Sequence, residues 1–242
     1  MKHRMLAAAL TLLCAAVQGW AQAAPSQTPA QTPTPAQTPS PQSPAATPTP
    51  TPDAPKSGSS DAKRKYEAML EKAKKGEGAV DYGALRLAFF ETPDYNPLAG
   101  MTVYRGLWGL VMQANWAEAA KQAEAVLEKN YVDANAHMVA HIAYREQGDA
   151  EKAKLHRRWA DGLIESIKAG GDGKSPATAW HVISISEEYA VIRSMNLRAT
   201  GQSLLNDKGH AYDMMKTLDS RTNTEVTLFF NVDKPFSAYG RK

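Results

Sequence analysis

A proline-rich stretch over residues 24–60 sets the first limit on what this chain can fold into. It holds eleven of the fifteen prolines and no large apolar side chain. Without aliphatic or aromatic surface to bury, such a segment cannot offset the entropy of ordering its backbone, and dense proline favours extended polyproline II. We therefore expect a disordered linker rich in Pro, Thr and Gln that serves as a spacer, and a globular domain confined to residues 61–242.

The first residues have the order of a secretory signal peptide. Two basic residues precede an apolar run from Met5 to Val17, and small residues follow up to Ala23. That run is too short for a permanent membrane anchor. We expect residues 1–23 to be a signal peptide cleaved after Ala23, which predicts a periplasmic or secreted protein. Cleavage after Ala24 and an uncleaved membrane anchor are the alternatives. Beyond this run no apolar stretch is long enough to span a bilayer, so we expect no transmembrane segment in the mature form.

Cysteine and charge counts exclude several classes of function. The one cysteine, Cys14, lies inside the expected signal peptide, so we expect no disulfide, thiolate nucleophile or cysteine-ligated zinc in the mature chain. Removing Lys2 and Arg4 with the peptide lowers the 28 basic residues to 26, against 25 acidic ones. A net charge of +1 gives no overall attraction to nucleic acid, and we expect no nucleic-acid partner.

Helical patterns fill the first part of the globular region, residues 61–168. Residues 61–76 place apolar side chains on one helical face and stop at a glycine. A second helix is expected to have Asp81 as its N-cap and to stop by Pro93. A third is expected to begin at Pro97, where the missing N–H costs a helix nothing.

An internal repeat follows over about residues 99–166. Trp116 aligns with Ala150, and Ala119 with Ala153, so both pairs have the same offset along the chain. That offset matches the period of the tetratricopeptide repeat, about 34 residues, in which small residues let two antiparallel helices approach each other. We predict two divergent repeats of this kind, with an unrelated pair of helical hairpins as the alternative.

Short alternating runs then predict a β-rich part over residues 177–233. Residues 179–186 are expected to form a strand, and 187–196 a helix capped by Ser186, with a strand as the alternative. Further strands are expected over 201–207, 210–219 and 224–233. Their short connections predict a small antiparallel β-sheet, covered on one face by helices. The predicted fold class is therefore α+β, with N-terminal helical hairpins resembling tetratricopeptide repeats and a C-terminal antiparallel sheet.

The segment Gly170–Pro176, GGDGKSP, is similar to half of a nucleotide-binding loop. The full loop requires a glycine five residues before Gly173, where Lys168 stands, and it must follow a strand and open a helix. Here the segment follows a helix, whose negative dipole end is unfavourable for phosphate. We expect no nucleotide partner but a helix stop and a turn, with Asp172 and Lys174 at the boundary where a cleft between the two parts would open.

Three histidines form the main candidate for a chemical site. His137 and His141 stand four residues apart, the spacing with which zinc proteases bring two imidazoles to one metal, and His156 falls on the next helix. Those proteases place a glutamate directly after the first histidine, and Met138 stands there instead. The carboxylates that would complete a shell for a divalent metal are Glu187, Glu188 and Asp213. The alternative is that the histidines are hydrogen-bonded packing residues in the seam of a helix pair.

Glu187 and Glu188 are also adjacent carboxylates beside a tyrosine. Adjacent residues point apart on a helix or a strand, so these two cannot flank one bond as a hydrolytic pair. We expect them in the first turn of a helix, where acidic side chains complement the helix dipole. Glu188 stays a catalytic candidate together with Asp172 and Lys174.

Five short motifs are spread over residues 81–233. They are Leu85-Arg86, Tyr95-Asn96-Pro97, the turn from Gly171 to Ser175, Glu187-Glu188-Tyr189 and Phe229-Phe230-Asn231. Together they resemble an exported bacterial family that is catalogued only as a domain of unknown function. The resemblance implies an envelope or extracellular setting and one fold unit that includes the helical and β parts. It carries over no activity.

Three hypotheses of function follow. The first, which the sequence favours, is a periplasmic or secreted binding or scaffold module, in which helical repeats present a concave face to a protein or peptide partner. The second is a metal-dependent or general acid–base enzyme that uses His137, His141 and His156. The third is a passive envelope component tethered by the proline-rich arm. We predict no cofactor, because only the enzyme hypothesis requires a divalent metal.

Overall fold

The computed structural model of the chain describes residues 60–97 and 99–238, all within one compact unit. Of residues 99–102 only the backbone is described. The expected signal peptide, residues 1–23, and all but the last residue of the expected linker, 24–60, lie outside the described residues.

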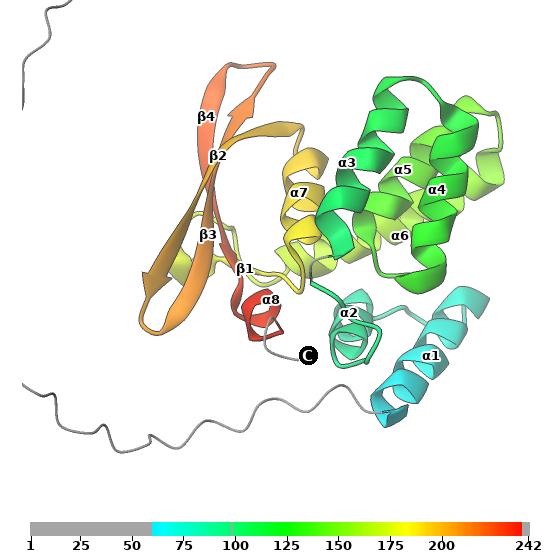
Figure 1. Cartoon of the computed structure of the whole chain (residues 1–242), viewed down its shortest axis with the longest axis horizontal. Coiled ribbons are helices and arrows are strands. Elements are labelled where there is room, and N and C mark those ends of the chain that lie inside the picture. Colours follow the sequence, from blue (N-terminus) through cyan, green and yellow to red (C-terminus); the bar gives the residue numbers. More distant parts are fainter. Residues whose placement is uncertain (1–59, 98, 239–242) are drawn as a thin grey trace, which may run out of the picture. The chain divides into compact units, whose positions relative to one another are not determined.

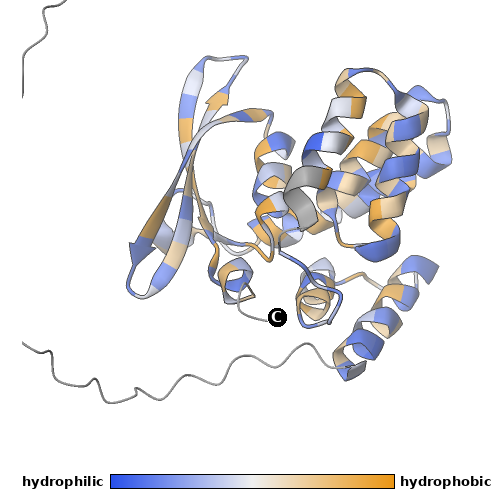
Figure 2. Ribbon diagram, in the orientation of Figure 1, coloured by the Kyte–Doolittle hydropathy of each residue, from blue (hydrophilic) through white to orange (hydrophobic). Residues whose placement is uncertain are grey.

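Helices α1 (Ser60–Lys75) and α2 (Tyr82–Phe90) pack against each other at the start of the fold. Asp81 is the N-cap of α2, as predicted, because its Oδ1 accepts a hydrogen bond from the backbone amide of Ala84 at 2.8 Å. The helix ends before Pro93, also as predicted. In Figure 2, hydrophilic residues cover most of α1, which buries only a narrow apolar face.

Four further helices form two hairpins. They are α3 (Ala99–Met112), α4 (Trp116–Lys129), α5 (Ala134–Glu146) and α6 (Ala150–Lys168). The offset of the internal repeat separates equivalent positions of the two hairpins, because the aligned residues Trp116 and Ala150 are the first residues of α4 and α6. The turn residues Ala114 and Gly148 have the same offset, and both have left-handed φ angles, 53° and 82°. Ala119 and Ala153 are buried at equivalent positions, where small side chains allow close packing. The resemblance of the two hairpins to tetratricopeptide repeats stays a prediction.

The C-terminal part contains a four-stranded sheet. Its elements are η1 (Pro176–Thr178), β1 (Trp180–His181), α7 (Ile185–Ser194), β2 (Leu197–Asp207), β3 (His210–Asp219), β4 (Thr224–Asn231) and α8 (Asp233–Ser237). Strands β2, β3 and β4 form an antiparallel meander, and the first turn places Lys208 and Gly209 at φ angles of 51° and 83°, typical of a type I′ hairpin. Strand β1 pairs in parallel with β4, so the sheet is mixed, in the order β1-β4-β3-β2. The fold class is α+β, as predicted.

The strand predicted over residues 179–186 is much shorter in the structure, because β1 ends at His181. The chain leaves the sheet here since the backbone amide of Ile183 donates a hydrogen bond to the carboxylate of Glu187, 2.8 Å away. The helix expected over 187–196 is confirmed as α7.

The N-cap of α7 is Ser184, so the prediction of Ser186 in that role is wrong. The Ser186 hydroxyl lies in the first turn and accepts a hydrogen bond from the side-chain amide of Asn135 on α5, 2.9 Å away. Strand β2 also begins earlier than predicted, at Leu197, because the chain reverses directly after α7 at Asn196, whose φ angle is 57°.

Helix α7 lies between the sheet and the helical hairpins (Figure 1). One core cluster joins α1, α2, α6, α7 and the sheet, and it contains Trp159, Leu163, Val182, Met215 and Phe230. A second cluster fills the space between α3, α4 and α5. Among the helices that the structure describes, none is both long and apolar enough to cross a membrane.

Candidate functional site

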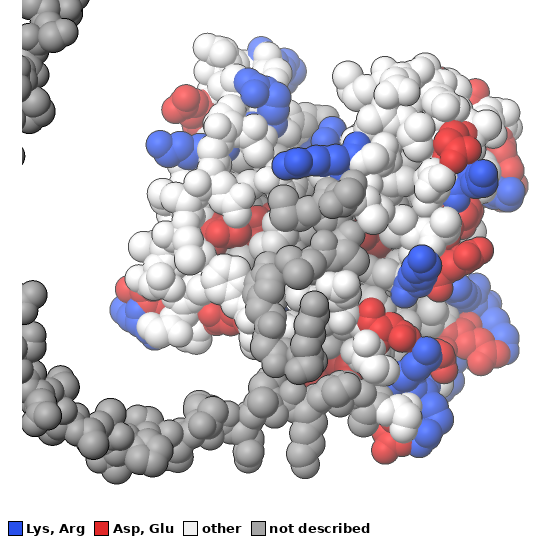
Figure 3. All heavy atoms as spheres, viewed as in Figure 1, with Lys and Arg blue, Asp and Glu red and all other residues white. Residues whose placement is uncertain are grey.

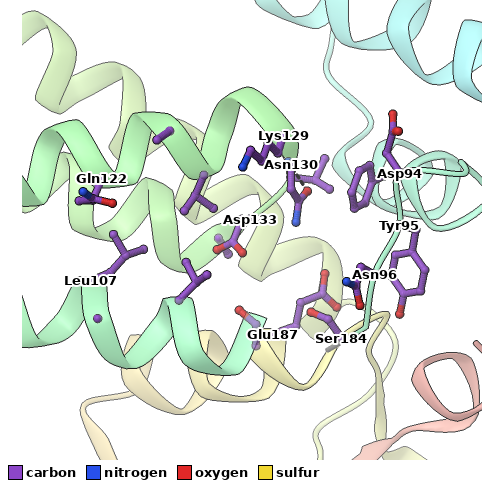
Figure 4. Close-up of a pocket in the computed structure, with 18 of the residues that line it drawn as sticks. Asp94, Tyr95, Asn96, Leu107, Gln122, Lys129, Asn130, Asp133, Ser184 and Glu187 are labelled. Carbon is purple, nitrogen blue, oxygen red and sulfur yellow. Dashed lines mark hydrogen bonds between the residues drawn. The ribbon is translucent and has the colours of Figure 1, made fainter. Parts of the chain in front are cut away.

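A cavity of about 720 Å³ lies beside α3 and α4. Its walls come from these helices, the α2–α3 connection, the α4–α5 loop and the beginning of α7 (Figure 4). The part between the two helices is lined mainly by apolar residues, namely Val103, Leu107, Leu110, Ala125 and Val126, and also by Glu118 and Gln122 of α4. The other end is polar and is lined by Asp94, Asn96, Lys129, Asn130, Asp133, Ser184 and Glu187. We call this cavity the groove.

Asp133 lies in the polar end of the groove, beside its apolar part (Figure 4). It is the N-cap of α5, and its Oδ1 accepts a hydrogen bond from the backbone amide of Ala136 at 2.9 Å. Burial raises the pKa of Asp133 to about 6, and the nearby Glu187 carboxylate adds to the rise, while the backbone amides oppose it. At neutral pH the groove therefore has an ionised carboxylate in a poorly solvated position.

A buried ion pair fixes the polar end of the groove. The Arg86 guanidinium donates to both carboxylate oxygens of Glu187, from Nε at 2.7 Å and from a terminal nitrogen at 2.6 Å. Both side chains are only 5% exposed. Arg86 also donates to the carbonyl of His181, and Glu187 accepts from the amide of Ile183. The pair thus connects α2 with the segment between β1 and α7.

Three further contacts hold the groove walls. The side-chain amide of Asn135 donates to the carbonyl and hydroxyl oxygens of Ser186, at 2.7 and 2.9 Å, and so joins α5 to α7. The indole N–H of Trp108 on α3 donates to the side-chain oxygen of Asn135, Oδ1, at 3.4 Å. The Tyr95 hydroxyl donates to the carbonyl of Ile183. Each contact joins segments that are distant in the sequence.

Two of the three candidate histidines meet in the seam between α5 and α6. The Nδ1 atoms of His137 and His156 are 2.9 Å apart. Nε2 of His137 lies 3.0 Å from the carbonyl oxygen of Tyr131, and Nε2 of His156 lies 3.2 Å from the carboxylate of Glu124. Burial lowers the pKa of His137 to about 3 and also lowers that of His156, where Glu124 opposes the change. All four ring nitrogens thus have protein partners.

His141 lies apart from this contact, with its Nδ1 atom 2.9 Å from the carbonyl oxygen of Ala153. Glu187 binds Arg86, so it completes no shell around the histidines. Among the residues that the structure describes, no group of three or more His, Cys, Asp or Glu side chains is placed to hold a metal ion. The metal-site hypothesis stays a prediction, which the metal content of the purified chain would test.

The segment GGDGKSP forms a turn that connects the end of α6 to the sheet. The Asp172 carboxylate accepts hydrogen bonds from the amide of Lys174 at 3.0 Å and the hydroxyl of Thr178 at 2.6 Å. The carbonyl of Gly173 accepts one from the amide of Phe229 in β4 at 2.8 Å. Asp172 and Lys174 are not among the residues that line the groove. The role observed for this segment is structural.

Glu188 is completely buried where α7 faces the sheet. No N–H or hydroxyl group of the described residues donates to either of its carboxyl oxygens. Burial raises the pKa of Glu188 well above its usual value of 4.5, and the nearby carboxylate of Asp213 raises it further. The raised pKa favours the protonated form of Glu188, in which the carboxyl group has a proton to donate to Asp213.

We expect this proton to make the stability of the fold depend on pH. In the unfolded chain Glu188 loses its proton above about pH 4.5, whereas in the folded chain the raised pKa keeps the proton bound to higher pH. The free energy of unfolding therefore falls as the pH rises from about 4.5 through the pKa of the folded state. A Glu188→Gln variant does not titrate here, so between pH 5 and 8 it should lose less stability than the wild type, by about 1 kcal/mol or more. Urea unfolding at both pH values measures this, and equal losses in the two proteins would refute the assignment.

The residues that line the groove or hold its walls in place were mostly missed by sequence reasoning. Arg86 carries one signal, since it is the only charged residue in the apolar helix α2. Asp133 carries another, as an acidic residue directly before a helix. The role of Asn135 has no local signal, because its partner is 51 residues away.

One family profile matches nearly the same residues as the fold described above. The sequence profile of a family described as "Domain of unknown function (DUF4919)" matches residues 62–241, which run from α1 to beyond α8. The chain belongs to this family. The resemblance to a domain of unknown function is thus confirmed, and the DUF4919 region includes both the helical part and the sheet. No curated protein and no solved structure matches the chain.

Proposed function

We propose that the chain is an exported binding module whose groove holds a peptide segment of a protein partner. The observation that supports this most is the two-part lining of the groove. A mainly apolar stretch between α3 and α4 leads to a polar end with a half-buried carboxylate, Asp133. Binding sites of this size usually combine apolar walls with a few polar groups that fix orientation. The expected signal peptide is the basis for placing the module in the periplasm or outside the cell.

Among the described residues that line the groove, the one poorly solvated charge without an ion pair is Asp133, and it favours a basic ligand. Lys129 also lines the groove, but it is exposed, so water and salt screen its charge. Arg86 neutralises Glu187, and Lys63 lies 2.8 Å from the carboxylate of Asp94. Asp133 has no ion-pair partner among the described residues, and the donors that it meets are backbone amides. An ammonium or guanidinium group of a ligand would supply the missing positive charge and would offset the cost of burying this carboxylate.

Elsewhere the exposed charges of this face are mixed. Figure 3 shows acidic and basic side chains interspersed over the helical part. Such a surface gives little long-range attraction to a partner. We therefore assign the selectivity of the module to the groove. The enzyme hypothesis gains no comparable support, because the ring nitrogens of His137 and His156 are taken up by the contacts described above.

The proposal is tested with two capped heptapeptides made of leucine and valine, one with two lysines and the other with two glutamates. We expect the lysine peptide to bind with a Kd of about 10–100 µM and the glutamate peptide to bind at least about tenfold more weakly. Isothermal titration calorimetry on the purified chain measures both. Equal affinity for the two peptides, or no binding of either, would contradict the proposal.

An Asp133→Asn variant provides the matched control for this titration. Asparagine is as good an N-cap as aspartate, so α5 should keep its first turn. The variant removes only the charge that we assign to recognition, and it should bring the affinities of the two peptides within about threefold of each other.

A further inference from the structure

Strand β2 forms one edge of the sheet, and within the described part of the chain no strand pairs with its outer side (Figure 1). It is 11 residues long, and its stretch 199–206 has neither a charge nor a proline. Natural edge strands are usually short, charged or interrupted, because an unpaired edge is a template for another strand. Leu204 adds apolar surface, since it is 52% exposed. The irregularity at Thr200 interrupts this edge only near its start, so residues 201–206 are open to pairing.

The backbone of β2 presents hydrogen-bonding groups along this edge. The type I′ turn makes Asp207 and His210 a hydrogen-bonded pair of the β2–β3 ladder. Hydrogen-bonded and non-hydrogen-bonded pairs alternate along an antiparallel ladder. The N–H and C=O groups of Gln202, Leu204 and Asn206 consequently point away from β3, toward the open edge.

Two opposite charges flank the uncharged stretch on one face of β2. Arg198 and Asp207 pair with Leu218 and His210 of β3, and these two partners are eight residues apart. Because side chains alternate along a strand, an even separation places both pairs on the same face. The irregularity at Thr200 makes this arrangement possible, since without the extra residue the two charges would lie on opposite faces. Neither charge has an ion-pair partner among the residues that the structure describes.

We propose that β2 pairs in antiparallel orientation with β2 of a second copy of this chain, which joins the two sheets edge to edge. With Ser203 on the two-fold axis, Gln202 lies opposite the partner's Leu204. Beyond the irregularity, Arg198 then lies opposite the partner's Asp207. Symmetry repeats this ion pair at the other end of the interface. The self-complementary order of the two charges selects a second copy as the occupant of the edge, in preference to a strand of another protein.

Charge reversal tests this pairing. We expect the purified full chain to form a concentration-dependent dimer in sedimentation equilibrium between about 1 and 100 µM. Arg198→Asp and Asp207→Arg should each weaken the dimer by roughly tenfold or more, because each replaces two attractions by two repulsions. The double variant restores opposite charges in swapped positions, and its dissociation constant should return to within about threefold of the wild-type value.

A Lys216→Glu variant is the matched control, because Lys216 is exposed on β3 and lies outside the edge. It should leave the dimer unchanged, and circular dichroism should show the same fold for all variants. A chain that stays monomeric at every concentration overturns the proposal. So does a dimer that the single reversals do not weaken, or a double variant that associates no better than the single ones.

Discussion

Replacing Arg86 by methionine is expected to lower the free energy of unfolding by about 3–5 kcal/mol. The substitution leaves the carboxylate of Glu187 in a site where it is 5% exposed and has lost two charge-assisted hydrogen bonds. Glu187 then has only the amide of Ile183 as a donor among the contacts observed here. A buried charge without its partner is costly because neither water nor an opposite charge stabilises it. Urea unfolding at pH 7 measures the loss.

Two controls separate this effect from a general effect of removing an arginine. Arg157 forms an exposed ion pair with Asp161, at 2.6 Å on one turn of α6, and Arg157→Met should cost less than about 0.5 kcal/mol. The double variant Arg86→Met, Glu187→Gln removes both buried charges and should be more stable than Arg86→Met alone. A loss below about 1 kcal/mol for Arg86→Met would show that the pair does not hold this end of the groove.

The second large effect is expected from Gly173→Ala, which should destabilise the fold by about 3 kcal/mol or more. Gly173 has a φ angle of 67°, which L-residues with a side chain rarely adopt. A Cβ atom at this position would lie 2.6 Å from the ring of Trp180, whose indole is buried and donates to the carbonyl of Gly171. The ring therefore cannot move aside without losing both packing and a hydrogen bond.

Gly76→Ala is the matched control for this change. Gly76 has nearly the same φ angle, 72°, but a Cβ atom there would meet no other atom within 4 Å. Its substitution should cost only the backbone strain, about 1–2 kcal/mol. Thermal or urea unfolding of both variants isolates the contribution of the Trp180 contact. Equal losses for the two variants would mean that the turn accommodates a side chain at Gly173.

Features that depend on contacts between residues close in the sequence were predictable. Asp81 caps α2 because its side chain reaches an amide three residues away, and the β2–β3 hairpin follows from a turn that Gly209 makes favourable. The internal repeat was visible because small residues recur at the same place in α4 and α6. Each of these signals lies within a few residues or within one repeat.

The groove was not predictable in the same way, because distant partners position its walls. Arg86 and Glu187 are 101 residues apart in the sequence. The same contact explains why β1 ends at His181, since Glu187 draws the Ile183 amide away from the sheet. The histidines were the more conspicuous sequence motif, yet burial in a helix seam gives His137 and His156 protein partners at every ring nitrogen. Residue type alone does not distinguish such packing from a metal site.

The central claim is that the groove beside α3 binds the partner, and blocking the groove tests it most directly. Gly106 and Gly109 both lie on α3 with no atom within 4 Å of an added Cβ, but only Gly106 is among the residues that line the groove. In the lysine-peptide titration, Gly106→Phe should weaken binding by at least about tenfold, while Gly109→Phe should stay within about twofold of the wild type. Unchanged binding in Gly106→Phe, or equal weakening in both variants, would contradict the claim that the groove is the binding site.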